Sequence, residues 1–297
     1  MNTKHQKSKR NAARTNIKIM IQIKNLSFNY GKRKEVFRNL NLTLTAGNVY
    51  GLLGKNGAGK SSLLRNIAGL LFPTSGTCEV NGYTAQDRLP SFLQELYFLP
   101  EEFHTPPVKI REFVDTYAPF YPNFSRKQFL EYLQEFQLSD NEKFTELSLG
   151  QKKKALIGFA LSTNTKVLLM DEPTNGLDIP SKSQFRKIIA SVATDERIII
   201  ISTHQVRDLD SLIDPIIILD NSEVLLHANT EEIAEKLCFK NVSTVSNHEN
   251  VLYSEHSLKG FSIVTQNLDS ETSKTDLELL FNATLMNSEK IKAIFSS

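Results

Sequence analysis

Residues 54–61, Gly-Lys-Asn-Gly-Ala-Gly-Lys-Ser, combine the residue types that hold a chain of phosphate groups. They follow the apolar run 49–53, typical of a buried strand, and precede 62–68, typical of a helix. Glycines let successive backbone N–H groups turn toward one anion, and a helix start adds unpaired N–H groups and partial positive charge. Lys60 adds a full charge for the β and γ phosphates, and the Ser61 hydroxyl is a hard ligand for Mg²⁺. We therefore predict a nucleotide phosphate site formed by Gly54, Lys55, Asn56, Gly57, Ala58, Gly59, Lys60, Ser61 and Ser62.

Acidic residues and a histidine follow two later apolar runs. Asp171 and Glu172 come directly after one run, and His204 ends another, with a helix-like segment at 181–192 between them. This order predicts a parallel βαβ unit, in which ligands bind beyond the carboxyl ends of the strands. One acid there can hold Mg²⁺, and an adjacent one can polarise a water in line with the γ phosphate. Alone, each would be an ordinary strand end, and the phosphate site in the same sheet favours the chemical interpretation.

An aromatic residue, Tyr30, stands in the turn-like sequence Asn-Tyr-Gly. A ring in that place can stack on a nucleobase, which contributes about 1–3 kcal/mol. An isolated tyrosine in a turn is more often a surface residue, so the residues alone leave both interpretations open.

The composition is that of an ordinary soluble globular protein. The chain has 297 residues, of which 40% are hydrophobic and 23% charged, and its formal net charge is +2. A charge so close to zero does not indicate a nucleic acid partner, and none is expected. Cys78 and Cys238 have no metal-ligand spacing around them and are expected to be reduced, as in the cytosol. No run of 18 apolar residues predicts a membrane span.

The N-terminal residues differ from the rest of the chain in composition. Residues 1–19 are polar and basic, and we expect a disordered tail there. An acid-free start containing arginine is weakly compatible with an organellar transit peptide. Another interpretation is that Met20, which precedes the strand-like 21–24, is the true start of the protein.

Periodicity along the chain predicts both strands and helices. Alternation over 20–53 indicates an antiparallel β layer, and the aromatic-rich stretch 108–161 has helical spacing. Shorter segments are predicted as a hairpin at 77–82, strands at 96–99, 251–253 and 261–264, and helices at 230–237 and 275–285.

With these residues in place, the sequence resembles the ATP-binding subunit of ABC (ATP-binding cassette) transporters, in particular single-cassette bacterial export-type ATPases. The resemblance runs in order from Tyr30 to His204 and includes residues 147–151, Leu-Ser-Leu-Gly-Gln, which open a helix and which generic phosphate-loop proteins lack. In this family the signature contacts the γ phosphate held by the other subunit of a head-to-tail dimer. The resemblance therefore implies that Ser148, Gly150 and Gln151 act in trans.

The resemblance also assigns roles to the other candidates. It implies ATP and Mg²⁺ as ligands, Tyr30 as the adenine-stacking residue, Glu172 as catalytic base and His204 as the residue that senses the γ phosphate. It further implies Asp178 in the dimer-contact loop, and the metal ligands Ser61, Asp171 and Glu101.

Two positions depart from the family pattern. Glu101 stands where the family usually has glutamine, and Leu149 where it usually has glycine. A carboxylate at 101 still accepts Mg²⁺ or orients water but adds negative charge, and a leucine at 149 restricts φ and adds bulk beside a phosphate contact. Because Ser148, Gly150 and Glu172 are present, we predict an active ATPase.

The resemblance implies a cytoplasmic protein held at the membrane by transmembrane permease subunits, and a homodimer or a heterodimer with a second ATP-binding subunit. Tyr117, Phe120 and Tyr121 are candidates for the docking groove. Two alternatives remain: a soluble cassette ATPase that acts on the ribosome or DNA, and a non-hydrolytic, ATP-gated dimerisation module.

The expected fold class is α/β. It comprises a phosphate-loop NTPase core with a parallel sheet, an N-terminal antiparallel β layer, an inserted helical subdomain and a small C-terminal α+β extension. The expected boundaries are 1–19 for the tail, 20–220 for the ATPase domain, about 101–165 for the helical subdomain, and 221–297 for the extension.

Overall fold

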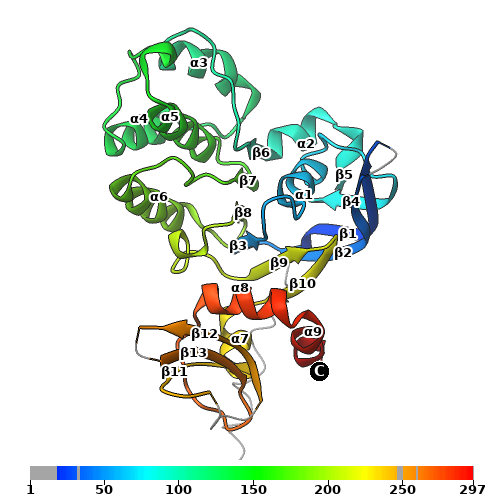
Figure 1. The fold of residues 1–297 in the computed structure, drawn as a ribbon. Coiled ribbons are helices and arrows are strands. Elements are labelled where there is room, and N and C mark those ends of the chain that lie inside the picture. Colours follow the sequence, from blue (N-terminus) through cyan, green and yellow to red (C-terminus); the bar gives the residue numbers. More distant parts are fainter. Residues whose placement is uncertain (1–18, 32–33, 246–249, 259, 297) are drawn as a thin grey trace, which may run out of the picture.

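The computed structural model describes residues 19–31, 34–245, 250–258 and 260–296 (Figure 1). The expected basic tail lies outside the described residues up to residue 18, and the first strand, β1, begins at Ile19.

A six-stranded sheet forms the centre of the molecule, with the strand order β10-β9-β3-β8-β7-β6. All neighbours pair in parallel except β10, which is antiparallel to β9. The strands are β3 (Asn48–Leu53), β6 (Leu96–Leu99), β7 (Val167–Asp171), β8 (Ile198–Thr203), β9 (Ile216–Asp220) and β10 (Glu223–Ala228).

Both faces of this sheet are buried, which explains the continuous apolar runs in β7 and β8. Successive side chains alternate between two separate hydrophobic cores. Leu168 and Ile199 lie in one core, whereas Leu169 and Ile200 lie in the other. The parallel βαβ unit predicted from the sequence is confirmed, with α6 (Ile179–Val192) connecting β7 and β8.

The second core packs against a four-stranded antiparallel sheet of order β2-β1-β4-β5, which confirms the predicted β layer and the hairpin. Its strands are β1 (Ile19–Tyr30), β2 (Lys34–Thr45), β4 (Ser75–Val80) and β5 (Tyr83–Thr84). Two helices accompany them, α1 (Lys60–Ile67) and α2 (Pro90–Glu95). The short helix α2, whose first residue is Pro90, was not predicted from the sequence.

The helical insertion contains α3 (Ile110–Tyr117), α4 (Arg126–Glu135) and α5 (Leu149–Ser162). Phe113, Phe124 and Phe129 surround the ring of Phe159, with ring centroids 5.2–6.4 Å away. Phe113 and Phe129 are buried in the core of this insertion. Tyr117 and Phe120, two of the docking candidates, are exposed.

The C-terminal part has an antiparallel sheet of order β11-β13-β12 and lies beside β9 and β10, with α8 between the two sheets (Figure 1). Its elements are α7 (Thr230–Lys236), β11 (Leu237–Val242), β12 (Val251–Ser257), β13 (Gly260–Gln266), α8 (Leu277–Met286) and α9 (Ser288–Ser296). The hydrophobic core of the ATPase sheet continues into this part through Leu226, Ile233 and Leu280. Strand β10 lies beyond the boundary expected at residue 220 but belongs to the central sheet.

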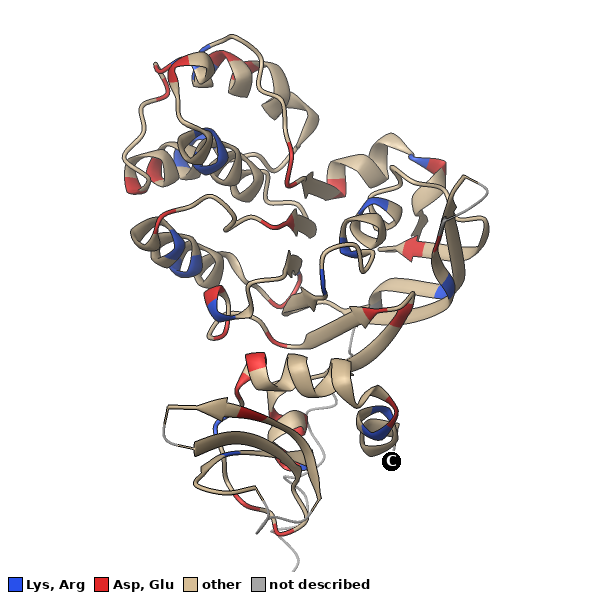
Figure 2. Ribbon diagram, in the orientation of Figure 1, with Lys and Arg blue, Asp and Glu red and all other residues tan. Residues whose placement is uncertain are grey.

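Within the described ranges, no helix is long and apolar enough to cross a membrane. Cys78 and Cys238 are buried free thiols, as expected. Acidic and basic residues occur on the helical insertion, the central part and the C-terminal part alike (Figure 2).

Candidate functional site

The glycine-rich segment joins β3 to α1, so the predicted strand–turn–helix arrangement is confirmed. Gly57 and Gly59 have φ values of 83° and 104°, a region that residues with a Cβ rarely adopt. A Cβ at Gly59 would also lie 2.8 Å from Cε1 of Phe37. These glycines allow the segment to curl in front of the N-terminus of α1, where backbone N–H groups are free to bind an anion.

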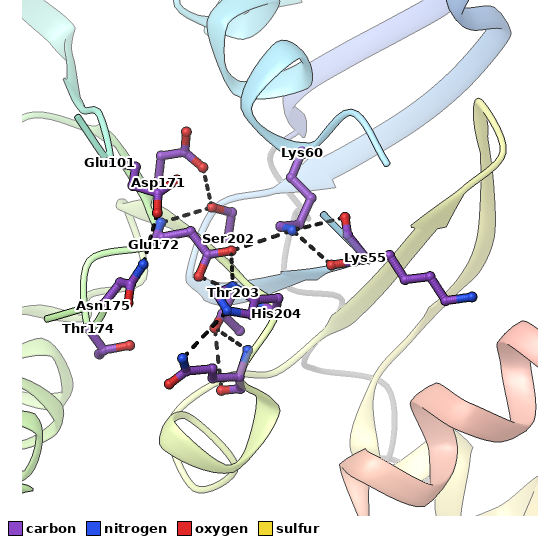
Figure 3. A network of polar contacts seen from close by, with 12 residues as sticks. Lys55, Lys60, Glu101, Asp171, Glu172, Thr174, Asn175, Ser202, Thr203 and His204 are labelled. Carbon is purple, nitrogen blue, oxygen red and sulfur yellow. Dashed lines mark hydrogen bonds and ion pairs between the residues drawn. The ribbon is translucent and has the colours of Figure 1, made fainter. Parts of the chain in front are cut away.

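Lys60, the first residue of α1, has a buried side chain that is only 6% exposed. Its ammonium group donates hydrogen bonds to the carbonyl oxygens of Gly54 and Lys55, at 2.8 and 3.3 Å. It also lies 3.4 Å from Oε1 of Glu172 (Figure 3). Because the ammonium group is held inside the curl of its own segment, a phosphate bound there would meet a positive charge.

Glu172 directly follows β7 and is 4% exposed. Its φ is 46°, a left-handed conformation that costs a residue with a side chain about 1–3 kcal/mol. Its N–H group is held by Ser202, whose carbonyl and hydroxyl oxygens lie 3.2 and 3.1 Å away. A strained, anchored backbone of this kind is common where a side chain must be aimed at a ligand.

The carboxylate of Glu172 meets His204 at the end of β8 (Figure 3). Nδ1 of His204 lies 2.9 Å from Oε1 of Glu172, close enough for an ion pair, but the two groups lack the alignment of a hydrogen bond. The backbone N–H of His204 donates to Oε2 at 3.4 Å. One carboxylate thus contacts both the lysine of the phosphate segment and the histidine.

Asp171 is the last residue of β7 and is buried. One of its carboxylate oxygens accepts a hydrogen bond from the Ser202 hydroxyl at 2.5 Å. The other oxygen makes no hydrogen bond to the described part of the chain. Ser202, which was not predicted, therefore positions both acidic residues.

A cleft of about 420 Å³ brings most of the predicted residues together. It is lined by Tyr30, Val36, Asn56, Gly57, Gly59, Lys60, Ser61, Ser62, Glu101, Glu172, Asn175 and His204. Tyr30 is 43% exposed and shares a hydrogen bond of 3.1 Å with the Ser62 hydroxyl, while Phe28 packs edge-on against its ring. A flat aromatic face and a phosphate site therefore border one cleft.

Asn175 and Val36 line the cleft but were not predicted. The amide of Asn175 donates to Oε1 of Glu101 at 2.9 Å, which joins the ends of β6 and β7. The available signal was the position of Asn175 in the polar loop that follows Glu172.

The signature residues and Asp178 do not line this cleft within the described chain. Ser148 and Gln151 cap the N-terminus of α5: the backbone N–H of Ser148 donates to Gln151 Oε1, and the Gln151 N–H donates to the Ser148 hydroxyl. Leu149 is 67% exposed and has no positive φ, so the backbone there does not need glycine. Asp178 caps α6, and hydrogen bonds from the hydroxyl and N–H of Ser181 lower the pKa of its carboxyl group.

The remaining residues predicted at the phosphate site contribute their backbone to it rather than a side chain. The side chain of Lys55 is exposed and points away from Glu172 (Figure 3), while Gly54 and Ala58 are buried. A Cβ at Gly54 would lie 2.7 Å from the carbonyl oxygen of Leu219, so only glycine fits there.

The candidate metal ligands, Ser61, Asp171 and Glu101, offer only hydroxyl and carboxylate oxygens. These are the donors that Mg²⁺ prefers, and the second oxygen of Asp171 is available, so the residues fit this metal. No cluster of three or more histidine, cysteine, aspartate or glutamate side chains suited to a metal occurs in the described ranges.

Residues 37–175 match the family model described as ABC transporter. The chain is 31% identical over 213 residues to the lantibiotic transport ATP-binding protein SrtF of Streptococcus pyogenes, covering 70% of this chain and 90% of that protein. It is 35% identical over 220 residues to the methionine import ATP-binding protein MetN of Carboxydothermus hydrogenoformans, covering 69% of this chain but only 65% of that protein. A solved ATP-binding subunit of an ABC transporter superposes with a TM-score of 0.66 at 25% identity, covering 72% of this chain and 91% of the other.

The matched region contains the phosphate segment, the signature and both acidic residues, and the relative that is almost fully covered is a transport ATP-binding protein. The chain therefore belongs to the ABC transporter family, as a subunit that binds and hydrolyses ATP to energise transport.

Proposed function

We propose that ATP is hydrolysed in the cleft between Tyr30 and His204, with Glu172 as the general base. The observation that carries this proposal is the position of the Glu172 carboxylate between Lys60, at 3.4 Å, and His204, at 2.9 Å. A base must lie within reach of the attacking water, and Glu172 borders the cleft beside the phosphate segment.

Lys60 and the N–H groups at the start of α1 would bind the phosphates, and Tyr30 would stack on the adenine. Ser61, Asp171 and Glu101 would hold Mg²⁺, which supplies positive charge to the phosphate oxygens. His204 would contact the γ phosphate while its Nδ1 remains beside Glu172, so that phosphate binding and the orientation of the base are linked.

We further propose a head-to-tail dimer. Ser148, Gly150 and Gln151 do not border their own chain's cleft, which supports their acting on the nucleotide of a second copy or a second ATP-binding subunit. Asp178 would contribute to the same dimer contact. ATPase activity per molecule is then expected to rise with protein concentration, and full activity in a monomer at high dilution would contradict the dimer.

The partners are proposed to be transmembrane permease subunits, which would hold this protein at the cytoplasmic face of the membrane. A mainly apolar cleft of about 440 Å³ lies between the helical insertion and the central part, and it includes Leu93, Phe98, Phe120 and Tyr121. Tyr117, also suggested from the sequence, is exposed nearby but does not border this cleft. An apolar groove of this kind suits a short amphipathic segment of a partner.

We propose residues 20–228 as the ATPase domain, because β10 completes its sheet, and the segment that follows as the extension. The helical subdomain would run from about 101 to 165, as the sequence suggested.

The main experiment compares the wild-type protein with Glu172→Gln, which keeps the size of the side chain but cannot accept a proton. We expect turnover to fall about 100-fold or more, since general bases contribute about 10²–10⁴-fold. Binding of a fluorescent ATP analogue should be retained. Equal turnover in the two proteins would refute Glu172 as base, and ATP binding without turnover in the wild type would favour a non-hydrolytic module.

A further inference from the structure

A buried lysine, Lys153, connects the signature helix to the loop that carries Glu172. It lies on α5 between Lys152 and Lys154, where basic residues mark the helix in Figure 2, and it is 4% exposed. Its ammonium group donates to the backbone carbonyl oxygens of Glu172 at 3.0 Å and of Asn175 at 2.9 Å. Lys153 thereby holds both ends of the turn that follows β7.

This turn places two groups at the nucleotide cleft. Glu172 brings its carboxylate, and Asn175 brings the amide that donates to Glu101. The turn is closed by one backbone hydrogen bond, from the N–H of Asn175 to the carbonyl of Glu172 at 3.2 Å. Because Glu172 has a φ of 46°, external contacts must hold its peptide in this strained conformation. Lys153 holds its carbonyl side, and Ser202 holds its N–H side.

Packing alone does not explain a lysine at this place. The neighbouring positions of α5 that face the core are apolar, Ala155, Leu156 and Ile157, and an apolar side chain at 153 would avoid the cost of burying an ammonium group. Lys153 makes no ion pair with a carboxylate in the described ranges, and its ammonium group donates to two carbonyl oxygens. Burial lowers the pKa of Lys153, while the charges of Glu101, Glu172 and Asp171 act in the opposite direction.

The start of the same helix also touches the end of the same loop. A Cβ built on Gly150 would lie 3.1 Å from the carbonyl oxygen of Gly176, so the two backbones are in close contact. The signature at the N-terminus of α5 and the loop from Glu172 to Gly176 are therefore joined at two points, one through backbone contact and one through Lys153.

We propose that Lys153 is a positioning residue for hydrolysis, which holds the Glu172–Asn175 turn and links it to the signature helix. This inference rests on the proposed role of Glu172. The proposal has a consequence for the dimer. Movement of Ser148 against the partner's nucleotide is transmitted along α5 to the Glu172 of the same chain. The two nucleotide sites would then be coupled through Lys153.

The test uses the full chain with Lys153→Met, Lys153→Gln and the control Lys152→Met. Methionine matches lysine in length and removes the donors, whereas glutamine keeps two amide donors on a shorter side chain. Lys152→Met makes the same chemical change one residue away, at a side chain with no hydrogen bond to the described chain. Three quantities are measured: affinity for a fluorescent ATP analogue, turnover at saturating ATP, and amide hydrogen exchange of residues 171–177.

For Lys153→Met we expect turnover to fall about 10- to 100-fold, because small displacements of a catalytic group have effects of this size. The affinity for the ATP analogue should stay within about threefold of the wild-type value, because Lys60 and the glycine-rich segment are unchanged. Exchange over 171–177 should accelerate, Lys153→Gln should recover a large part of the turnover, and Lys152→Met should behave as wild type.

Two results would overturn the inference. One is unchanged turnover and exchange in Lys153→Met. The other is an equal loss in the methionine and glutamine variants together with lost ATP affinity, which would indicate a general packing role. If the wild type itself turned over no ATP, the proposed function would fail, and the hydrogen exchange of 171–177 would still decide whether Lys153 holds the turn.

Discussion

At the scale of single residues, contacts with neighbouring side chains hold the groups of the site in position. Tyr30 is an example, because its ring is held by Phe28 on one side and its hydroxyl by Ser62. This arrangement places a flat apolar surface at the rim of the cleft. The ring and the hydroxyl can be tested separately.

We expect Tyr30→Ala to weaken binding of an ATP analogue by about 1–3 kcal/mol, the usual contribution of a base stacked on an aromatic ring. Tyr30→Phe keeps the ring and loses only the part-buried hydrogen bond to Ser62, so its affinity should stay close to that of the wild type. Fluorescence titration with labelled ATP measures both. Equal losses in the two variants would show that the hydroxyl, and not stacking, matters.

Arg197 offers a stability prediction away from the cleft. It is 6% exposed, its Nε and Nη2 have no hydrogen-bond partner in the described structure, and burial lowers its pKa to about 10. The group is charged at neutral pH, and two of its nitrogens lose hydration without a hydrogen-bond partner in the described structure.

We predict that Arg197→Met raises the free energy of unfolding by about 1–3 kcal/mol, because an uncompensated buried charge is replaced by an apolar side chain of similar length. Urea denaturation monitored by circular dichroism would measure the change, with the slope against denaturant unchanged. A lower free energy of unfolding would show that the guanidinium group has a stabilising partner.

At the scale of elements, the N-terminus of α5 combines a structural and a proposed chemical role in Ser148. Its hydroxyl accepts a hydrogen bond from the N–H of Gln151, and in a dimer it would also face the partner's nucleotide. Aspartate and serine are comparably good N-caps, but only aspartate would repel a phosphate.

Ser148→Asp should therefore keep the stability of the wild type within about 0.5 kcal/mol while losing most turnover. Ser148→Ala should lose about 1 kcal/mol of stability through the missing cap. Thermal unfolding and steady-state ATPase assays give the two readouts. Wild-type turnover in Ser148→Asp would argue against the signature acting on a phosphate.

The sequence predicted the elements that carry a strong local signal. The parallel strands were predictable because their apolar runs are buried on both faces, and the phosphate segment because its glycines and lysine are contiguous. Asn175, Ser202 and Lys153 were not predictable, because their roles come from contacts between segments far apart in the chain. Strand β10 was missed as part of the core, because antiparallel pairing with β9 cannot be read from its own residues.

At the scale of the whole molecule, the C-terminal part shares the hydrophobic core of the ATPase. Leu280 on α8 is fully buried in the cluster that also contains Leu168 of β7. The exposed Arg207–Glu278 ion pair also joins the two parts, but exposed pairs contribute less than about 1 kcal/mol. The shared apolar contacts are therefore the main connection.

We expect Leu280→Ala to lower the free energy of unfolding by about 2–5 kcal/mol, and to do so in one transition for both parts. Leu268→Ala removes an exposed leucine and is the matched control. Calorimetry would distinguish one transition from two. A separate early transition in Leu280→Ala, with the ATPase part unchanged, would show that the C-terminal part folds independently.

The contact between Lys60 and Glu172 has a further consequence for how a triphosphate enters the site. Lys60 is already paired with a carboxylate of its own chain, so a bound phosphate competes with Glu172 for the same ammonium group. Part of the attraction of Lys60 for phosphate is cancelled by the partner it must leave, and the carboxylate oxygen that is set free can then accept a hydrogen bond from water. Phosphate binding at Lys60 would in this way release the proposed base toward water, so that the arrival of substrate and the readiness of the base are linked.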